Sequence, residues 1–159
     1  MSPEQQSENS PGKIRIQYLQ FKDIEDDIKP PPPNLVSKFK TLQDWLLDIC
    51  NSNKPKKSII KFKFELFESA NDYTIVLAGV NTYDEGKNRS VTRIEYRPRN
   101  MYFKLQETYY VGLDRQQLLD KLTAELKDFS NTEKFRNSFF TKARIVVFET
   151  NGQTVWSAQ

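Results

Sequence analysis

Apolar residues recur at every second position in several parts of the chain, a pattern typical of half-buried β-strands. Polar residues that form turns separate these runs, notably at residues 69–72 and 84–90. Pro98 and Asn100 interrupt the pattern, and the run after them either continues the preceding strand or begins another. The predicted strands lie at residues 14–18, 60–66, 73–77, 92–96 and 101–105.

Strand formers also occupy the end of the chain, at residues 145–148 and 154–156. Asn151 and Gly152 stand between them, and both residue types accept the positive φ of a type I′ turn. The sequence therefore predicts a C-terminal β-hairpin closed by such a turn.

Apolar residues spaced three or four apart predict a first amphipathic helix that ends near Cys50. Its start has two candidates. Thr41 and Asp44 have the spacing of a capping box, whereas Asn34 would place the N-terminus two turns earlier. Asn51 and Pro55 end the helix, because proline cannot continue it.

A second amphipathic helix follows Asp114 and runs to Phe129. Asp114 and Gln117 are again three residues apart, as in a capping box. The aromatic residues beyond it, Phe135, Phe139 and Phe140, indicate a short extra turn or a packed loop.

The order of these elements predicts an α+β fold, a single two-layer domain. We expect a mainly antiparallel sheet of about six strands with two amphipathic helices packed on one face. This domain covers residues 13–159, with Pro30–Pro33 as a stiff internal connector. Residues 1–12 are polar and lack large apolar side chains, so we expect a disordered tail.

The sequence contains few residues arranged for catalysis. The sequence has no histidine, which removes histidine-dependent triads and histidine-based metal sites, and its five glycines form no phosphate-binding loop. The acidic cluster at residues 23–27 lacks the glycine and terminal glutamate of a calcium loop, so we interpret it as a solvated linker. Cys50 is interpreted as a small buried hydrophobe. We expect no catalytic residue, no metal and no cofactor.

Positive charge is slightly in excess, with 24 Lys and Arg against 21 Asp and Glu. If Ile94 and Tyr96 face the core, Arg93 and Arg97 project from the opposite face of their strand. Guanidinium groups in such a stripe match carboxylates and phosphates equally well. The candidate partner-binding residues are Arg89, Arg93, Tyr96, Arg97, Arg99 and Tyr102. A second basic group, comprising Lys54, Lys56, Lys57, Lys61 and Lys63, is interpreted as structural, since lysines protect exposed sheet edges.

A non-catalytic module that binds a protein partner, of the inhibitor or immunity and antitoxin type, is the function we expect. One alternative is nucleic-acid binding, with Tyr96 or Tyr102 stacking on bases. A second is a structural subunit of a larger assembly, marked by an exposed apolar patch. The lone cysteine and the absence of an apolar leader or membrane-length run predict a cytoplasmic protein.

Overall fold

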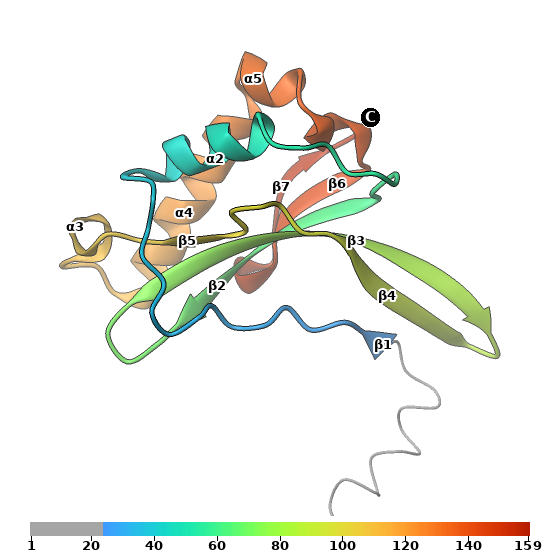
Figure 1. Cartoon of the computed structure of the whole chain (residues 1–159), viewed down its shortest axis with the longest axis horizontal. Helices are drawn as coiled ribbons and strands as arrows, with labels where there is room; N and C mark the ends of the chain where they lie inside the picture. The colour runs from blue at the N-terminus through green and yellow to red at the C-terminus, as the bar shows by residue number, and fades with distance from the viewer. Residues whose placement is uncertain (1–23) are drawn as a thin grey trace, which may run out of the picture. The chain divides into compact units, whose positions relative to one another are not determined.

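Residues 24–159 of the protein are described by a computed structural model (Figure 1). The predicted tail at residues 1–12 and the predicted strand at residues 14–18 lie outside the described residues. Within residues 24–159, no helix is long and apolar enough to cross a membrane.

The chain divides into two compact units, and the smaller one includes residues 24–27 and 81–93. Residues 81–93 are the end of a hairpin formed by β3 (Tyr73–Gly86) and β4 (Arg89–Tyr96). Lys87 and Asn88 form its turn with positive φ angles of 54° and 62°, so the predicted polar turn is confirmed.

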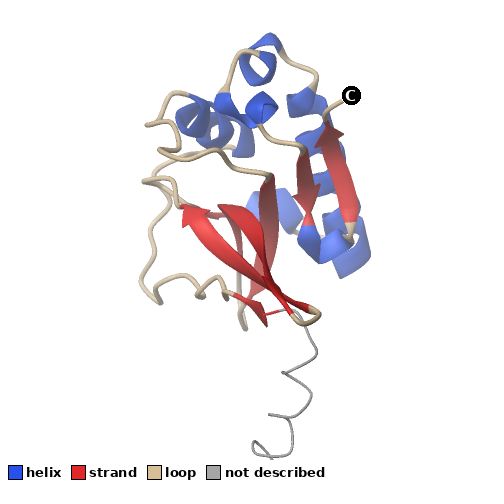
Figure 2. Ribbon diagram, turned by 90° about the vertical axis from the view of Figure 1, so that its right-hand side faces the viewer, coloured by secondary structure: helices blue, strands red, loops and turns tan. Residues whose placement is uncertain are grey.

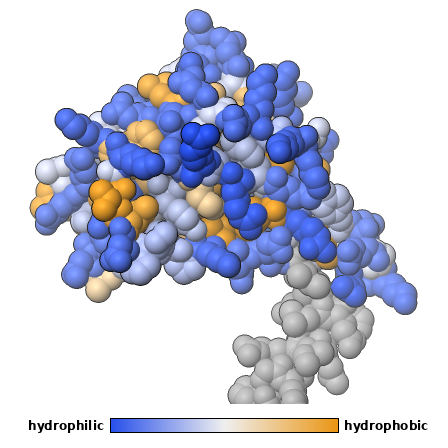
Figure 3. All heavy atoms as spheres, in the orientation of Figure 1, coloured by the Kyte–Doolittle hydropathy of each residue, from blue (hydrophilic) through white to orange (hydrophobic). Residues whose placement is uncertain are grey.

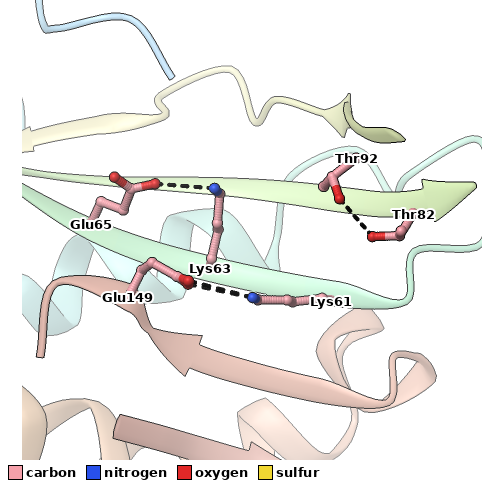
Figure 4. A network of polar contacts seen from close by, with 6 residues as sticks. All are labelled: Lys61, Lys63, Glu65, Thr82, Thr92 and Glu149. Atoms are coloured by element: carbon pink, nitrogen blue, oxygen red, sulfur yellow. Dashed lines mark hydrogen bonds and ion pairs between the residues drawn. The ribbon is translucent and has the colours of Figure 1, made fainter. Parts of the chain in front are cut away.

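Within the smaller unit, β4 contacts β1 through strand pairing and β3 through a side-chain hydrogen bond. β1 (Ile24–Glu25) pairs in parallel with the first half of β4, opposite Val91 and Thr92. The hydroxyl groups of Thr82 and Thr92 lie 2.8 Å apart and link β3 to β4 (Figure 4).

The larger unit, residues 28–80 and 94–159, contains six strands of a seven-stranded sheet, including only the end of β4. The strand order is β4-β3-β2-β6-β7, and β5 also pairs with β3. In this unit β2 and β6 pair in parallel, whereas the β2–β3, β3–β5 and β6–β7 pairs are antiparallel. The additional strands are β2 (Lys61–Glu68), β5 (Tyr102–Lys104), β6 (Ile145–Phe148) and β7 (Gln153–Ser157).

Two main helices, α2 (Leu42–Cys50) and α4 (Arg115–Ser130), pack on one face of this sheet (Figure 2). Trp45 of α2 and Leu122 of α4 share one buried core with Phe64 of β2 and Leu77 of β3. The predicted α+β class is therefore confirmed. Shorter helical segments complete the unit: α3 (Glu107–Tyr110), α5 (Glu133–Arg136), η1 (Phe139–Lys142) and η2 (Glu149–Asn151).

Side-chain caps set the helix starts. Thr41 Oγ1 accepts a hydrogen bond from the Asp44 amide at 3.0 Å, so α2 begins at the later of the two predicted positions. The Asn34 start is wrong, because Thr41 has extended backbone angles and residues 35–40 are not helical. At α4, Asp114 and Gln117 each bond the other's amide, which confirms the predicted capping box.

The C-terminal hairpin is confirmed, but its predicted type I′ turn is wrong. Between β6 and β7 the chain forms the short helical turn η2, and only Gly152 takes a left-handed conformation (φ 62°, ψ 22°). Tertiary bonds determine this shape. Thr150 Oγ1 accepts from the Leu66 amide at 2.8 Å, and Asn151 Nδ2 donates to Thr123 Oγ1 at 2.9 Å.

The lysines of β2 do not protect a sheet edge, so that part of their interpretation is wrong. β2 lies between β3 and β6, because parallel pairing with β6 fills its other side. Lys61 and Lys63 instead pair with carboxylates: Lys61 with Glu149 at 3.3 Å and the nearly buried Lys63 with Glu65 at 3.2 Å (Figure 4).

Candidate partner-binding site

A cavity of about 590 Å³ opens where the C-terminal end of α2 meets the segment between β4 and β5. α2 ends at Cys50 with Asn51 as its C-cap, and Pro98 follows the last residues of β4. Two segments far apart in the sequence thus form one concave surface, which we call the basic cavity. It is lined by Asp48, Asn51, Ser52, Asn53, Lys54, Lys56, Glu95, Tyr96, Arg97, Pro98, Arg99 and Asn100.

Hydrogen bonds from the core fix the walls of the basic cavity. Trp45 Nε1 donates to the Asn100 carbonyl at 2.6 Å, and Asn100 Nδ2 donates to Asp48 Oδ2 at 3.1 Å. On the opposite segment, the Tyr96 hydroxyl donates to the Asn53 carbonyl at 3.0 Å. Since Trp45 and Tyr96 are buried, the loops that carry the cavity are tied to the core.

The electrostatic character of the cavity comes from Lys54, Lys56, Arg97 and Arg99, all of which are exposed. None of these four side chains forms an ion pair or hydrogen bond with another described residue. Both carboxylates of the lining are engaged: Asp48 by Asn100, and Glu95 by Lys57 at 2.7 Å. The cavity therefore presents unpaired positive charge.

An adjoining cavity of about 320 Å³, which we call the apolar cavity, shares Lys54 and Lys56 with the first. Pro55, Ile59, Phe62 and Phe139 form its apolar lining, together with Lys57, Ser58 and Lys142. Rings connect the two cavities. Tyr96 of the basic cavity lies with its ring centroid 6.0 Å from that of Phe62 and 5.4 Å from that of Phe139.

Gly79 of β3 allows this close packing. A Cβ atom at this position would lie 2.9 Å from Ile59, 3.0 Å from Tyr96 and 3.1 Å from Phe62. These distances are shorter than ordinary van der Waals contacts, so only glycine fits here without displacement of its neighbours. Gly79 therefore positions lining residues of both cavities.

Burial shifts the pKa values of two neighbouring groups, Tyr96 and Cys50, further above neutral pH. Burial, with a smaller contribution from the charge of an ionised Cys50, raises the pKa of Tyr96 to about 12. Burial also raises the pKa of the Cys50 thiol, although a hydrogen bond with Ser138 and the charge of Lys134 oppose the shift. Neither group supplies a nucleophile at that pH.

A different cavity, of about 460 Å³, holds Tyr109, Lys121 and Glu125. The Tyr109 hydroxyl donates to Glu125 Oε2 at 2.6 Å. Lys121 Nζ donates to the Tyr109 carbonyl at 2.9 Å and lies 3.8 Å from the centre of its ring. Burial and Glu125 raise the pKa of Tyr109. Because these groups satisfy one another, this cavity offers less unpaired charge than the basic cavity.

The structure brings together part of the predicted partner-binding set. Tyr96, Arg97 and Arg99 line the basic cavity. Tyr96 is buried, whereas both arginines are exposed. Tyr102 lies outside the lining, and its hydroxyl donates to the Lys29 carbonyl at 2.7 Å. Arg89 and Arg93 belong to the smaller unit, where both are exposed and Arg89 lies 3.6 Å from Glu85.

Lys54 and Lys56 are the site residues that the sequence interpretation missed. The sequence pattern groups them with the lysines of β2, but both precede that strand and lie in the loop after α2. Their position outside the alternating pattern was the available signal, because the edge-protection argument does not extend to a loop. Their proximity to Arg97 and Arg99 comes from tertiary structure alone.

Side chains of metal-ligand type do not gather in the part of the chain that the structure describes: no group of three or more could hold an ion. Comparison with protein-family models, with curated proteins and with solved structures finds no match. The site is accordingly interpreted from its own residues.

Proposed function

We propose that the chain is a non-catalytic binding module that holds an acidic protein partner against the basic cavity. The observation that carries this proposal is the convergence of Lys54, Lys56, Arg97 and Arg99, unpaired with any described residue, on walls tied to the core. Carboxylates of a partner would supply the missing counter-charges. Arginine is well suited to this task because its guanidinium group binds a carboxylate through two parallel hydrogen bonds.

The arrangement of the tyrosines favours a protein over a nucleic acid. Nucleic-acid sites of this kind combine positive charge with exposed rings on which bases stack. Tyr96 is buried against Phe62 and Phe139, so its ring offers no such platform. The basic cavity provides the charge but not the stacking surface.

Action by occlusion fits a site of this type. A non-catalytic protein of the inhibitor or immunity type acts by covering the functional surface of its partner, which is here an acidic surface. Charge complementarity would also accelerate association and make it sensitive to salt. We propose a cytoplasmic setting for this interaction, because the chain has one cysteine and so cannot form an internal disulfide.

Capture of the partner from nuclease-treated extract of the source cells tests the proposal. Wild-type chain should retain a protein that forms a stoichiometric complex after purification, and the double variant Arg97→Glu and Arg99→Glu should lose it. Lys38→Glu is the matched control, since Lys38 is exposed and precedes the opposite end of α2.

Two results would contradict the proposal. Equal retention by wild type and the double variant would remove the basic cavity from the interaction. Loss of all captured material on nuclease treatment would assign the site to nucleic acid instead.

A further inference from the structure

We infer that the acidic partner binds through an extended segment in which one apolar side chain, flanked by carboxylates, enters the apolar cavity. This inference rests on the proposed function and adds the chemistry of the segment that is recognised. It follows from the adjacency of two unlike cavities, one rich in unpaired positive charge and the other with an apolar lining.

The two cavities form one continuous surface. Lys54 and Lys56 line both cavities, so a single bound segment passes from one to the other across residues 54–56. The ring packing of Tyr96 against Phe62 and Phe139 makes their walls one unit. A ligand that occupied only the basic cavity would leave the adjoining apolar lining unused.

The composition of the apolar cavity identifies its occupant. Pro55, Ile59, Phe62 and Phe139 contribute apolar surface, whereas Lys54, Lys56 and Lys142 contribute positive charge and Lys57 is already paired with Glu95. Lysine commonly covers apolar surface with its methylene groups while its ammonium group stays in water. An apolar side chain therefore fits against this lining, and carboxylates on either side of it can reach the ammonium groups.

Hydrogen-bonding capacity separates this occupant from a nucleic-acid base. The side chains of the apolar cavity offer donors at the lysines, and Ser58 carries the only side-chain acceptor of the lining. A base in this cavity would have to desolvate amino groups that find few partners, at a cost in affinity. An aliphatic or aromatic side chain has no such requirement.

Synthetic peptides test the inference on the full chain. The first probe has a single phenylalanine between runs of aspartate and glutamate, and the second replaces that phenylalanine with serine at identical charge. Fluorescence anisotropy at low salt should show binding of the first probe that is about tenfold or more tighter, because a buried phenylalanine adds favourable transfer free energy. Equal affinity of the two probes, or binding of neither, would overturn the inference.

A substitution at the apolar cavity tests whether the phenylalanine probe binds there. Lys142 is exposed and lines the apolar cavity but not the basic cavity. Lys142→Glu should weaken the phenylalanine probe several-fold, while Lys38→Glu should change its affinity little. Equal effects of the two substitutions would contradict an apolar anchor at this site.

The two proposals fail separately. The serine probe could bind as well as the phenylalanine probe while extract capture still requires Arg97 and Arg99. In that case the proposal of an acidic partner is retained, and the proposal of an apolar side chain in the apolar cavity is wrong. If capture does not depend on the arginines, the proposed function itself is wrong.

Discussion

At the scale of single residues, Gly79 has more influence on the site than its missing side chain suggests. Its Cα faces Ile59, Tyr96 and Phe62, which line the two cavities. Nothing in the sequence singled it out, because the pattern of apolar positions in β3 does not show which residue approaches another segment closely.

Substitution Gly79→Ala should lower the free energy of unfolding by about 1–3 kcal/mol, since the added methyl group overpacks a filled region. Chemical denaturation of wild type and variant measures the difference. An unchanged or higher stability would show that Ile59 and Tyr96 have room to move, contrary to the distances in the structure.

Tyr96 gives the fold a specific response to alkaline pH. Burial raises its pKa to about 12 from the ordinary value of 10.0. The folded chain therefore holds the phenolic proton more tightly than the unfolded chain does. The resulting stabilisation is complete below about pH 10 and is lost as the pH rises through about 12.

Denaturant unfolding of wild type and Tyr96→Phe between these pH values isolates this contribution. Wild-type stability should fall by about 1–3 kcal/mol more than that of the variant over the range. Tyr102, Tyr109 and Tyr110 also have raised pKa values, so both proteins lose stability and only the difference is diagnostic. Parallel curves would contradict the burial of Tyr96.

At the scale of elements, helix caps that depend on neighbouring residues could be predicted, whereas a turn shaped by tertiary contacts could not. Both helix caps involve residues three apart, so the Thr41 cap of the Asp44 amide and the capping box of Asp114 with Gln117 could be found from spacing alone. Asn151-Gly152 has an equally clear local preference for a type I′ turn. Hydrogen bonds to distant residues override it: Thr150 accepts from the Leu66 amide, and Asn151 donates to the Thr123 hydroxyl.

The start of α2 can be tested by two substitutions at the rival positions. Thr41→Ala should cost about 0.5–2 kcal/mol of stability, because it removes the side-chain cap of the Asp44 amide. Asn34→Ala should change stability little, since Asn34 is exposed and caps no helix. A larger effect at Asn34 than at Thr41 would contradict the observed start.

The central strand β2 contains a charge pair with little access to solvent. Side-chain exposures are 9% for Lys63 and 28% for Glu65. Glu65→Gln should destabilise the fold by about 1–3 kcal/mol, because it leaves a nearly buried ammonium group without its counter-charge.

Lys63→Met is the matched comparison, since it removes the charge and keeps the shape of the side chain. Its cost in unfolding free energy should be smaller than that of Glu65→Gln in the same denaturation experiment. The reverse order would show that Lys63 is solvated in the folded state.

At the scale of the whole molecule, the proposed site is a product of tertiary structure. The sequence located Arg97 and Arg99 as partner-binding candidates, and the structure adds lysines from a loop some forty residues earlier in the chain, at positions 54 and 56. No local pattern links these segments. Apolar surface is dispersed on the face drawn in Figure 3, where hydrophilic side chains predominate.

The most direct test of the central claim is an amide NMR titration of the full chain with the captured partner protein. The account predicts that perturbations concentrate at residues 51–57 and 95–100, the two segments of the basic cavity, and weaken as salt is added. Perturbations confined to the exposed face of α4, with both segments unchanged, would contradict it.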